Sequence, residues 1–348
     1  MMPGPSDVSV TDRRLPAFVL TGYLGAGKTT LVNHILSRDH GRRYAVLVNE
    51  FGEIGIDNDL IVDSREELFE LNNGCICCTV RGDLIRTLRN LVKNTDSGSL
   101  DGIVIETTGL ADPGPIIQTF FVDQILMAQV RLDSVTTVVD AHHIRHQLET
   151  SREAAEQVGF ADQILLNKID LAAGELAAIE GQLRHLNGHA PIHRVERAEI
   201  DLSAVLGRGG FDLQRIAAAN IDHGPSETHN HVNDADCADD GHVGHIHAAG
   251  IGSVSLRIDH PIDAAGLENW LEDLLQRRGQ DILRTKGIFD IAGENRKWVF
   301  QSVHMLLDGD FRQSWRAGEA RASRMIFIGR DLDKGELQQG LNACMAPH

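Results

Sequence analysis

A glycine-rich segment near the N-terminus carries residue types that bind phosphate. Residues 22–29 read Gly-Tyr-Leu-Gly-Ala-Gly-Lys-Thr, a complete G-x-x-x-x-G-K-[ST] pattern between an apolar run and a helical pattern. In this pattern, backbone N–H groups surround phosphate oxygens, the lysine neutralises the β and γ phosphates, and the threonine hydroxyl binds Mg²⁺. We therefore predict a nucleotide phosphate site made of Gly22, Gly25, Ala26, Gly27, Lys28, Thr29 and Thr30.

A second segment places a carboxylate where it could reach the same magnesium ion. Residues 103–109 read Ile-Val-Ile-Glu-Thr-Thr-Gly, an apolar strand that ends in an acid and is followed by a glycine. We expect Glu106 to reach Mg²⁺ directly or through water, and the Gly109 N–H to meet a γ-phosphate. Lys28, Thr29 and Glu106 are the predicted catalytic residues, with Thr29 and Glu106 as magnesium ligands.

A third segment is typical of base recognition. Asn167, Lys168 and Asp170 form an N-K-x-D tetrapeptide about 140 residues after the phosphate loop, at the end of an expected strand. The Asp170 carboxylate can accept from both the N1–H and the exocyclic amine of guanine, whereas adenine offers no such pair. Lys168 would lie along the base. The pattern predicts GTP and GDP, rather than ATP, as ligands.

Three cysteines within four residues indicate metal chemistry. Cys75, Cys77 and Cys78 can act as thiolates that bind Zn²⁺ above all, with Co²⁺ or Ni²⁺ allowed by geometry. Three local sulfurs leave one coordination position open, which suits exchange of the ion rather than a closed structural site. Buried structural cysteines and a redox pair are the alternatives.

Two further segments add candidate ligands. In the acidic segment 49–57, Glu50, Glu53 or Asp57 could position water, touch Mg²⁺ or complete the thiolate site, and the sequence leaves that choice open. Between residues 222 and 248, six histidines stand among acidic residues and predict weak metal binding, unless the segment is a solvated spacer. They are His223, His229, His231, His242, His245 and His247.

The elements that must position these residues alternate as in α/β proteins. Short β-rich runs predict strands at 17–21, 44–49, 102–106, 134–140 and 163–167, and helical patterns follow the phosphate loop and span 83–92 and 175–186. This alternation predicts a mostly parallel sheet flanked by helices. After Gly250, expected strands at 253–259, 287–291, 298–305 and 324–329 and helices at 263–276 and 334–342 follow in a β-α-β-β-β-α order, which indicates a smaller α+β domain. We expect a flexible leader at 1–15, a nucleotide-binding domain at 16–221, a His/Asp-rich linker at 222–249 and a C-terminal domain at 250–348.

The amino-acid composition disfavours some classes of binding partner. With 33 Lys and Arg against 50 Asp and Glu, the formal charge of −17 repels nucleic acid backbones. No apolar run approaches the ~18 residues of a membrane span, and the N-terminus lacks the pattern of a signal peptide, so we expect no membrane partner and a cytoplasmic location. Five cysteines, three of them clustered, do not suggest a disulfide framework.

Taken in order, these motifs resemble those of the CobW family of P-loop GTPases. Residues 22–29, 49–52, 74–78, 106–113 and 167–170 carry the resemblance, and residues 285–289 and 325–329 are similar to the CobW C-terminal domain. The resemblance implies a P-loop GTPase fold and a GTP-dependent metallochaperone or insertase, for zinc in many members and for cobalt in some. A His-rich linker is common in the family.

The resemblance also implies a mechanism. GTP and Mg²⁺ would order residues 49–57 near the thiolates, so that the γ-phosphate biases metal affinity and hydrolysis releases the ion to a client metalloprotein. Intrinsic turnover should be slow because neither an arginine finger nor a Ras-like glutamine is evident, and homo-oligomerisation is left open. The rivals are a zinc buffer that uses the linker and a small-molecule kinase. A kinase does not need the cysteines, and a buffer does not need Asp170.

Overall fold

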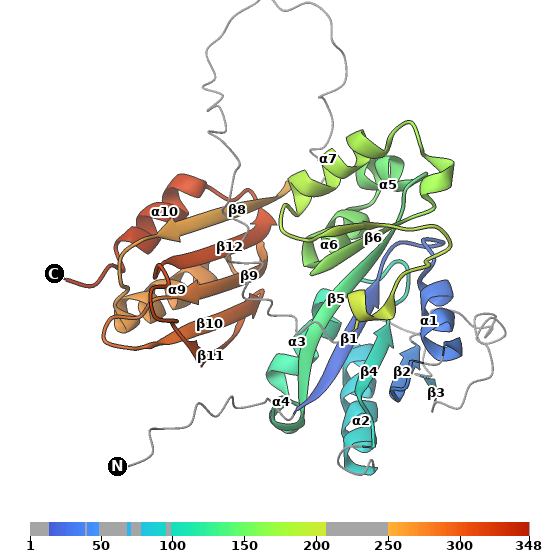
Figure 1. Ribbon diagram of the computed structural model, residues 1–348, viewed down its shortest axis with the longest axis horizontal. Helices are drawn as coiled ribbons and strands as arrows, with labels where there is room; N and C mark the ends of the chain where they lie inside the picture. Colours follow the sequence, from blue (N-terminus) through green and yellow to red (C-terminus); the bar gives the residue numbers. More distant parts are fainter. Residues whose placement is uncertain are drawn as a thin grey trace, which may run out of the picture.

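The computed structural model describes residues 14–38, 40–48, 68–70, 78–94, 99–206 and 250–347, with only the backbone described for 68–70 and 78–81. The first domain is built on a parallel seven-stranded sheet in the order β3-β2-β4-β1-β5-β6-β7 (Figure 1). Its strands are β1 (Leu15–Thr21), β2 (Tyr44–Val48), β3 (Leu68–Glu70), β4 (Gly102–Glu106), β5 (Val130–Asp140), β6 (Gln163–Asn167) and β7 (Ile192–Arg194).

Helices cover both faces of this sheet. Every residue of β2, β4 and β6 is buried, as expected for parallel strands enclosed on both sides. Phe18 and Leu20 of β1 pack with α1 (Lys28–Ser37), whereas Ala17 and Val19 belong to the core on the opposite face. The remaining helices of the domain are α2 (Cys78–Asn94), α3 (Gly114–Val122), α4 (Gln124–Gln129), α5 (Ile144–Thr150), α6 (Arg152–Phe160) and α7 (Leu176–Leu186).

The second domain is an antiparallel sheet with two helices. Its strand order is β11-β10-β9-β12-β8. One face packs on the helices α9 and α10, and the other shares a continuous apolar core with the first domain. The elements are β8 (Ile251–Ile258), α9 (Ala264–Arg278), β9 (Ile282–Phe289), β10 (Arg296–Val303), β11 (Leu306–Ser314), β12 (Ser323–Arg330) and α10 (Lys334–Asn342).

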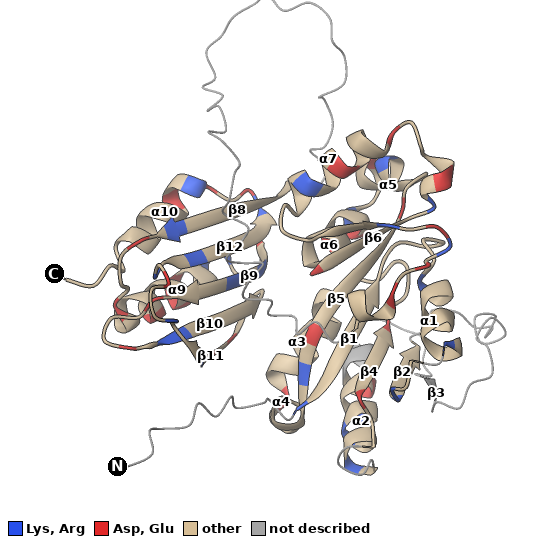
Figure 2. Cartoon of the chain, in the orientation of Figure 1, with Lys and Arg blue, Asp and Glu red and all other residues tan. Residues whose placement is uncertain are grey.

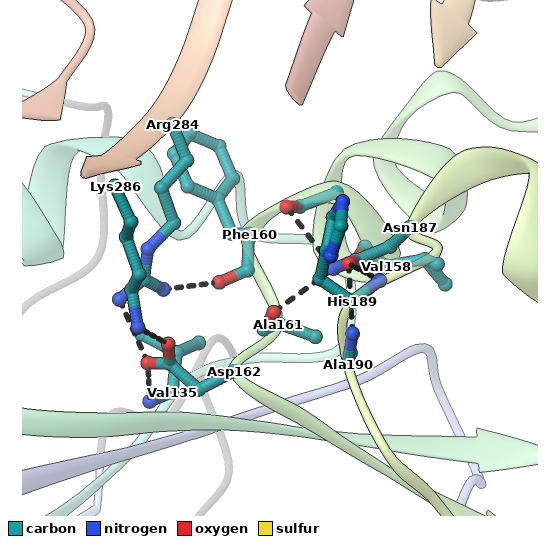
Figure 3. Close-up of polar contacts among 11 residues, drawn as sticks. Val135, Val158, Phe160, Ala161, Asp162, Asn187, His189, Ala190, Arg284 and Lys286 are labelled. Carbon is teal, nitrogen blue, oxygen red and sulfur yellow. Dashed lines mark hydrogen bonds and ion pairs between the residues drawn. The ribbon is translucent and has the colours of Figure 1, made fainter. Parts of the chain in front are cut away.

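Charged side chains join the two domains at their junction. Strands β1, β2 and β6 carry no charged residue, whereas β9 and β12 carry basic ones (Figure 2). Arg284 of β9 donates to Phe160 O at 2.6 Å and to Asp162 Oδ2 at 2.7 Å, and Lys286 also pairs with Asp162 (Figure 3). Asp162 accepts from the Val135 N–H as well, at 2.8 Å. A buried carboxylate in the loop before β6 therefore fastens the C-terminal sheet to the parallel sheet.

The predicted fold class is confirmed, although several elements differ. Strands expected at 102–106 and 163–167 have these bounds, but β5 begins at Val130 rather than Ser134. The strand expected at 287–291 is β9, which starts at Ile282, and β11 was not predicted because its residues are mostly polar and exposed. Helices α3 to α6 were not predicted either. Strand β1 starts at Leu15, inside the expected leader, and the expected linker lies outside the described residues.

None of the helices in the described ranges combines the length and the apolar content needed to cross a lipid bilayer.

Candidate nucleotide site

The phosphate loop joins β1 to α1 and depends on close backbone packing. Gly27 has a φ of 110°, and a Cβ at this position would lie 2.5 Å from Asn167 Nδ2, so neither the conformation nor the space allows a larger residue. Lys28, the first residue of α1, is buried, and its Nζ donates to Gly22 O at 2.8 Å and to Tyr23 O at 3.2 Å. The ammonium group is thus held at the loop, beside a helix N-terminus that favours anions. Ala26 is buried, whereas Gly25 and Thr30 are exposed.

The predicted magnesium ligands lie next to each other. Thr29 Oγ1 donates to Glu106 Oε1 at 3.0 Å, although 77 residues separate them in the chain. The parallel register pairs Leu20 with Glu106, which places this buried carboxylate at the carboxyl edge of β4, level with the phosphate loop. A hydroxyl and a carboxylate are hard oxygen ligands of the kind that Mg²⁺ prefers, so the two side chains fit the ion.

The loop that follows Glu106 lies against the phosphate loop. Thr107 donates from its backbone N–H to Leu20 O and from its hydroxyl to Thr21 Oγ1, both at 2.9 Å. A Cβ built on Gly109 would lie 2.7 Å from Leu24 N, so the backbones of the two loops are in direct contact. Gly109 therefore lies against the phosphate loop.

The base-recognition segment is tied to the phosphate loop. Asn167, buried at the end of β6, donates from Nδ2 to Ala26 O at 2.9 Å and accepts at Oδ1 from the Ala198 N–H at 2.8 Å. Lys168 follows with a φ of 60°, and Asp170 is exposed in the 3-10 turn Ile169–Leu171. The structure therefore brings all the predicted nucleotide residues to one edge of the sheet.

Asp140 was not predicted, and it holds Lys168 in place. Its Oδ2 accepts from Lys168 Nζ at 2.8 Å and contacts His143 Nδ1 at 3.0 Å. Burial by itself raises the pKa of Asp140, but the hydrogen bonds from Lys168 and His143 outweigh burial and hold that pKa below its ordinary value. Asp140 ends β5, between β1 and β6, so its position at a strand end was the available signal.

The predicted zinc ligands lie outside the described residues, except for the backbone of Cys78. Cys78 begins α2, and only its backbone is described. Within the described ranges, no group of three or more His, Cys, Asp or Glu side chains could hold a metal ion. The candidates outside those ranges are Glu50, Glu53, Asp57, Cys75, Cys77, His223, His229, His231, His242, His245 and His247.

Comparison with known protein families shows which family this chain belongs to. The CobW/HypB/UreG nucleotide-binding domain matches residues 16–194, and the cobalamin synthesis protein cobW C-terminal domain matches residues 251–345. The chain belongs to the CobW family. The match includes both domains, so the C-terminal sheet is part of the family architecture and not an unrelated addition.

Relatives of this CobW-family chain are similar over nearly its whole length. It is 39% identical over 324 residues to the zinc chaperone YjiA of Escherichia coli, covering 92% of this chain and 95% of that protein. It is 35% identical over 367 residues to the zinc chaperone CobW of Pseudomonas aeruginosa, covering 96% and 92%. The crystal structure of Zn(II)-bound YjiA superimposes with a TM-score of 0.70 at 32% identity, covering 96% of this chain and 99% of that one. A YjiA variant in which one glutamate and two cysteines are replaced by alanine was also crystallised with Zn(II) bound.

Proposed function

We propose that this protein is a GTP-hydrolysing metallochaperone that binds zinc at Cys75, Cys77 and Cys78 and transfers it to a client metalloprotein. One observation supports the GTPase part of this proposal. The side chains that would bind the nucleotide lie together at one edge of the parallel sheet, and they are Lys28, Thr29, Glu106 and Asn167. The naming of two full-length relatives as zinc chaperones supports the metal part. From the sequence, we expect the protein to be cytoplasmic.

Each part of the nucleotide would meet a specific group. Lys28 and the backbone N–H groups of the phosphate loop would neutralise the β and γ phosphates, and Asp170 would accept from the guanine edge. Thr29 and Glu106 would hold Mg²⁺, which when bound neutralises the charge that develops on the phosphates. We expect slow intrinsic turnover, with GDP and phosphate as products.

The sheet register supports a link between the nucleotide and the cysteines. Val48 of β2 pairs with both Glu70 of β3 and Glu106 of β4, so the carboxyl ends of these strands are at one edge. The chain continues from Val48 into the acidic segment 49–57 and from Glu70 toward Cys75 and Cys77. Both connections therefore begin at the sheet edge that carries Glu106. This starting point supports coupling between the γ-phosphate and the metal ligands.

The test is a zinc titration in two nucleotide states. We expect the protein to bind zinc with different affinity when loaded with a non-hydrolysable GTP analogue and with GDP. Typical couplings are about 1 to 3 kcal/mol, or about 5- to 150-fold, and zinc must change the nucleotide affinity by the same factor. Zinc content alone is a poor readout, since the YjiA variant lacking two cysteines was also crystallised with Zn(II).

Cys77→Ser is the informative variant, because serine keeps the size but loses the soft thiolate. The chain offers a matched control in Cys344, a buried free cysteine of the C-terminal domain whose Sγ lies 3.3 Å from Gly340 O. Cys344→Ser should keep the nucleotide-dependent site, and Cys77→Ser should lose it. Identical zinc affinities of the wild type in both nucleotide states would contradict the chaperone function.

A further inference from the structure

Gln157 is a buried glutamine that reaches the loop beside the phosphate site. It lies on α6 with 1% of its surface exposed, and its Nε2 donates to Gly109 O and to Ala111 O, both at 3.1 Å. Both partners are backbone carbonyls, which accept only, so the network assigns the amide nitrogen to this side. Gln157 is itself held in place, because Thr137 Oγ1 donates to its backbone carbonyl at 2.7 Å.

The loop that Gln157 holds is enclosed on two sides. On the nucleotide side, Gly109 lies against the backbone of Leu24 in the phosphate loop. On the other side, the Gly109 carbonyl accepts from Gln157. The Gly109 N–H is the donor expected to meet the γ-phosphate, and only the φ and ψ torsions of Gly109 separate it from the carbonyl that Gln157 holds. The two hydrogen bonds from Gln157 therefore restrict the backbone that positions this donor.

Helix α6 connects the loop to the C-terminal domain. Glu156, next to Gln157, pairs with Arg330 of β12 and accepts from Arg152 Nε at 2.7 Å. Two residues further on, a Cβ at Gly159 would lie 3.0 Å from Leu283 Cδ1 of β9. The Phe160 carbonyl accepts from Arg284 (Figure 3). One helix thus contacts the Gly109 loop through Gln157 and the C-terminal sheet through the residues beside it.

We propose that Gln157 is a positioning residue for GTP hydrolysis, which fixes the Gly109 loop to α6 and so to the C-terminal sheet. The proposal rests on the GTPase function proposed above. Gln157 acts through the loop that contains Gly109 and Ala111, in which the Gly109 N–H is the group expected to meet the γ-phosphate. Loss of the side-chain amide should therefore lower kcat and weaken binding of a GTP analogue, while GDP affinity stays unchanged. A purely structural role would weaken both nucleotides alike or neither.

Gln157→Met removes the two hydrogen bonds and keeps the length of the side chain. Gln163→Met is the matched control, because Gln163 is equally buried and donates to Thr136 Oγ1 at 2.8 Å and Val205 O at 3.0 Å. It begins β6, at the strand end opposite to Asn167 and the nucleotide. We expect comparable losses of stability in urea, but a fall in kcat of about 10- to 100-fold only in Gln157→Met, since misplacing a group by ~1 Å can cost about 100-fold.

A second variant tests the same contact even if Gln157→Met folds poorly. In Gln157→Glu, a protonated carboxyl could still donate to one carbonyl, whereas the ionised form would repel both. Its kcat should therefore fall with rising pH relative to wild type. Equal kcat values for Gln157→Met and Gln163→Met, or the wild-type pH profile in Gln157→Glu, would overturn the role of Gln157 alone. A wild type that releases no phosphate from GTP would overturn both proposals.

Discussion

Asn167 Nδ2 and Ala26 O are 2.9 Å apart, so a single hydrogen bond joins the start of the base-recognition segment to the phosphate loop. The two residues are 141 positions apart in sequence. Because the same amide accepts from the Ala198 N–H through its oxygen, it bridges three separate parts of the chain. This buried side chain sets the distance between the expected base and phosphate subsites.

Asn167→Ala should weaken GTP and GDP binding to a similar extent. Removing the amide leaves the Ala26 carbonyl and the Ala198 N–H without their partner, at a cost of about 1 to 3 kcal/mol. Titration with fluorescent nucleotides measures the loss. Gln163→Ala is the matched control, because Gln163 is buried on the same strand, donates to Thr136 Oγ1 at 2.8 Å and to Val205 O at 3.0 Å, and begins β6 at the end opposite to Asn167. If both variants lose nucleotide affinity equally, the bridge is merely structural.

Asp170→Asn should remove the preference for guanine. The wild-type carboxylate would accept from two guanine donors, and losing this pair should cost roughly 2 to 4 kcal/mol, or 30- to 1,000-fold in GTP affinity, with ATP affinity little changed. Competition between GTP and ATP gives the ratio directly. Asp259→Asn, at an exposed ion pair with Arg257, is the control and should keep the ratio. Equal affinity of the wild type for both nucleotides would contradict the assignment of Asp170.

The site residues that could be predicted from the sequence are those that belong to short, continuous motifs. Lys28, Thr29 and Asn167 belong to short motifs, and the parallel-sheet pattern placed them at strand ends. Asp140 had only its position at a strand end as a local signal, because its partner Lys168 lies 28 residues away. Gln157 could not be found in this way, because its partner Gly109 lies 48 residues away and nothing local marks the contact. The sequence pattern placed the start of strand β9 at residue 287 instead of Ile282 for a related reason. Its residues Arg284 and Lys286 are polar as a sequence but partnered by Asp162 across the domain junction.

Replacing residues 223–247 with a Gly/Ser segment of equal length should remove weak zinc binding and leave the nucleotide-dependent site. Six imidazoles on an acidic segment must be neutral to bind metal, so their zinc affinity should fall below pH ~6, near the ordinary histidine pKa of about 6.5. Calorimetry at pH 7.5 and 5.5 separates the two classes of site. Unchanged zinc stoichiometry at pH 7.5 would show that the segment is a spacer.

Asp162 makes the stability of the domain junction depend on pH. Burial by itself raises its pKa, but Arg284 and Lys286 outweigh burial and lower the pKa below the ordinary value. A lowered pKa means that the folded state binds the proton more weakly than the unfolded chain. The stabilisation is therefore complete above the unfolded pKa of about 3.9, and it is lost as the pH falls from there through the lower folded value.

Asp162→Asn should destabilise the protein by about 3 to 5 kcal/mol at pH 7, because it leaves the buried Arg284 without its counter-charge. The difference between wild type and variant should shrink as the pH falls below about 4, since protonated aspartate and asparagine are both neutral. Urea unfolding at pH 7 and at steps down to pH 3 measures this difference. Asp273→Asn, which breaks an exposed pair with Arg277, should change stability by less than about 1 kcal/mol at every pH. A constant difference between wild type and Asp162→Asn across this range would show that the Asp162 charge does not hold the two domains together.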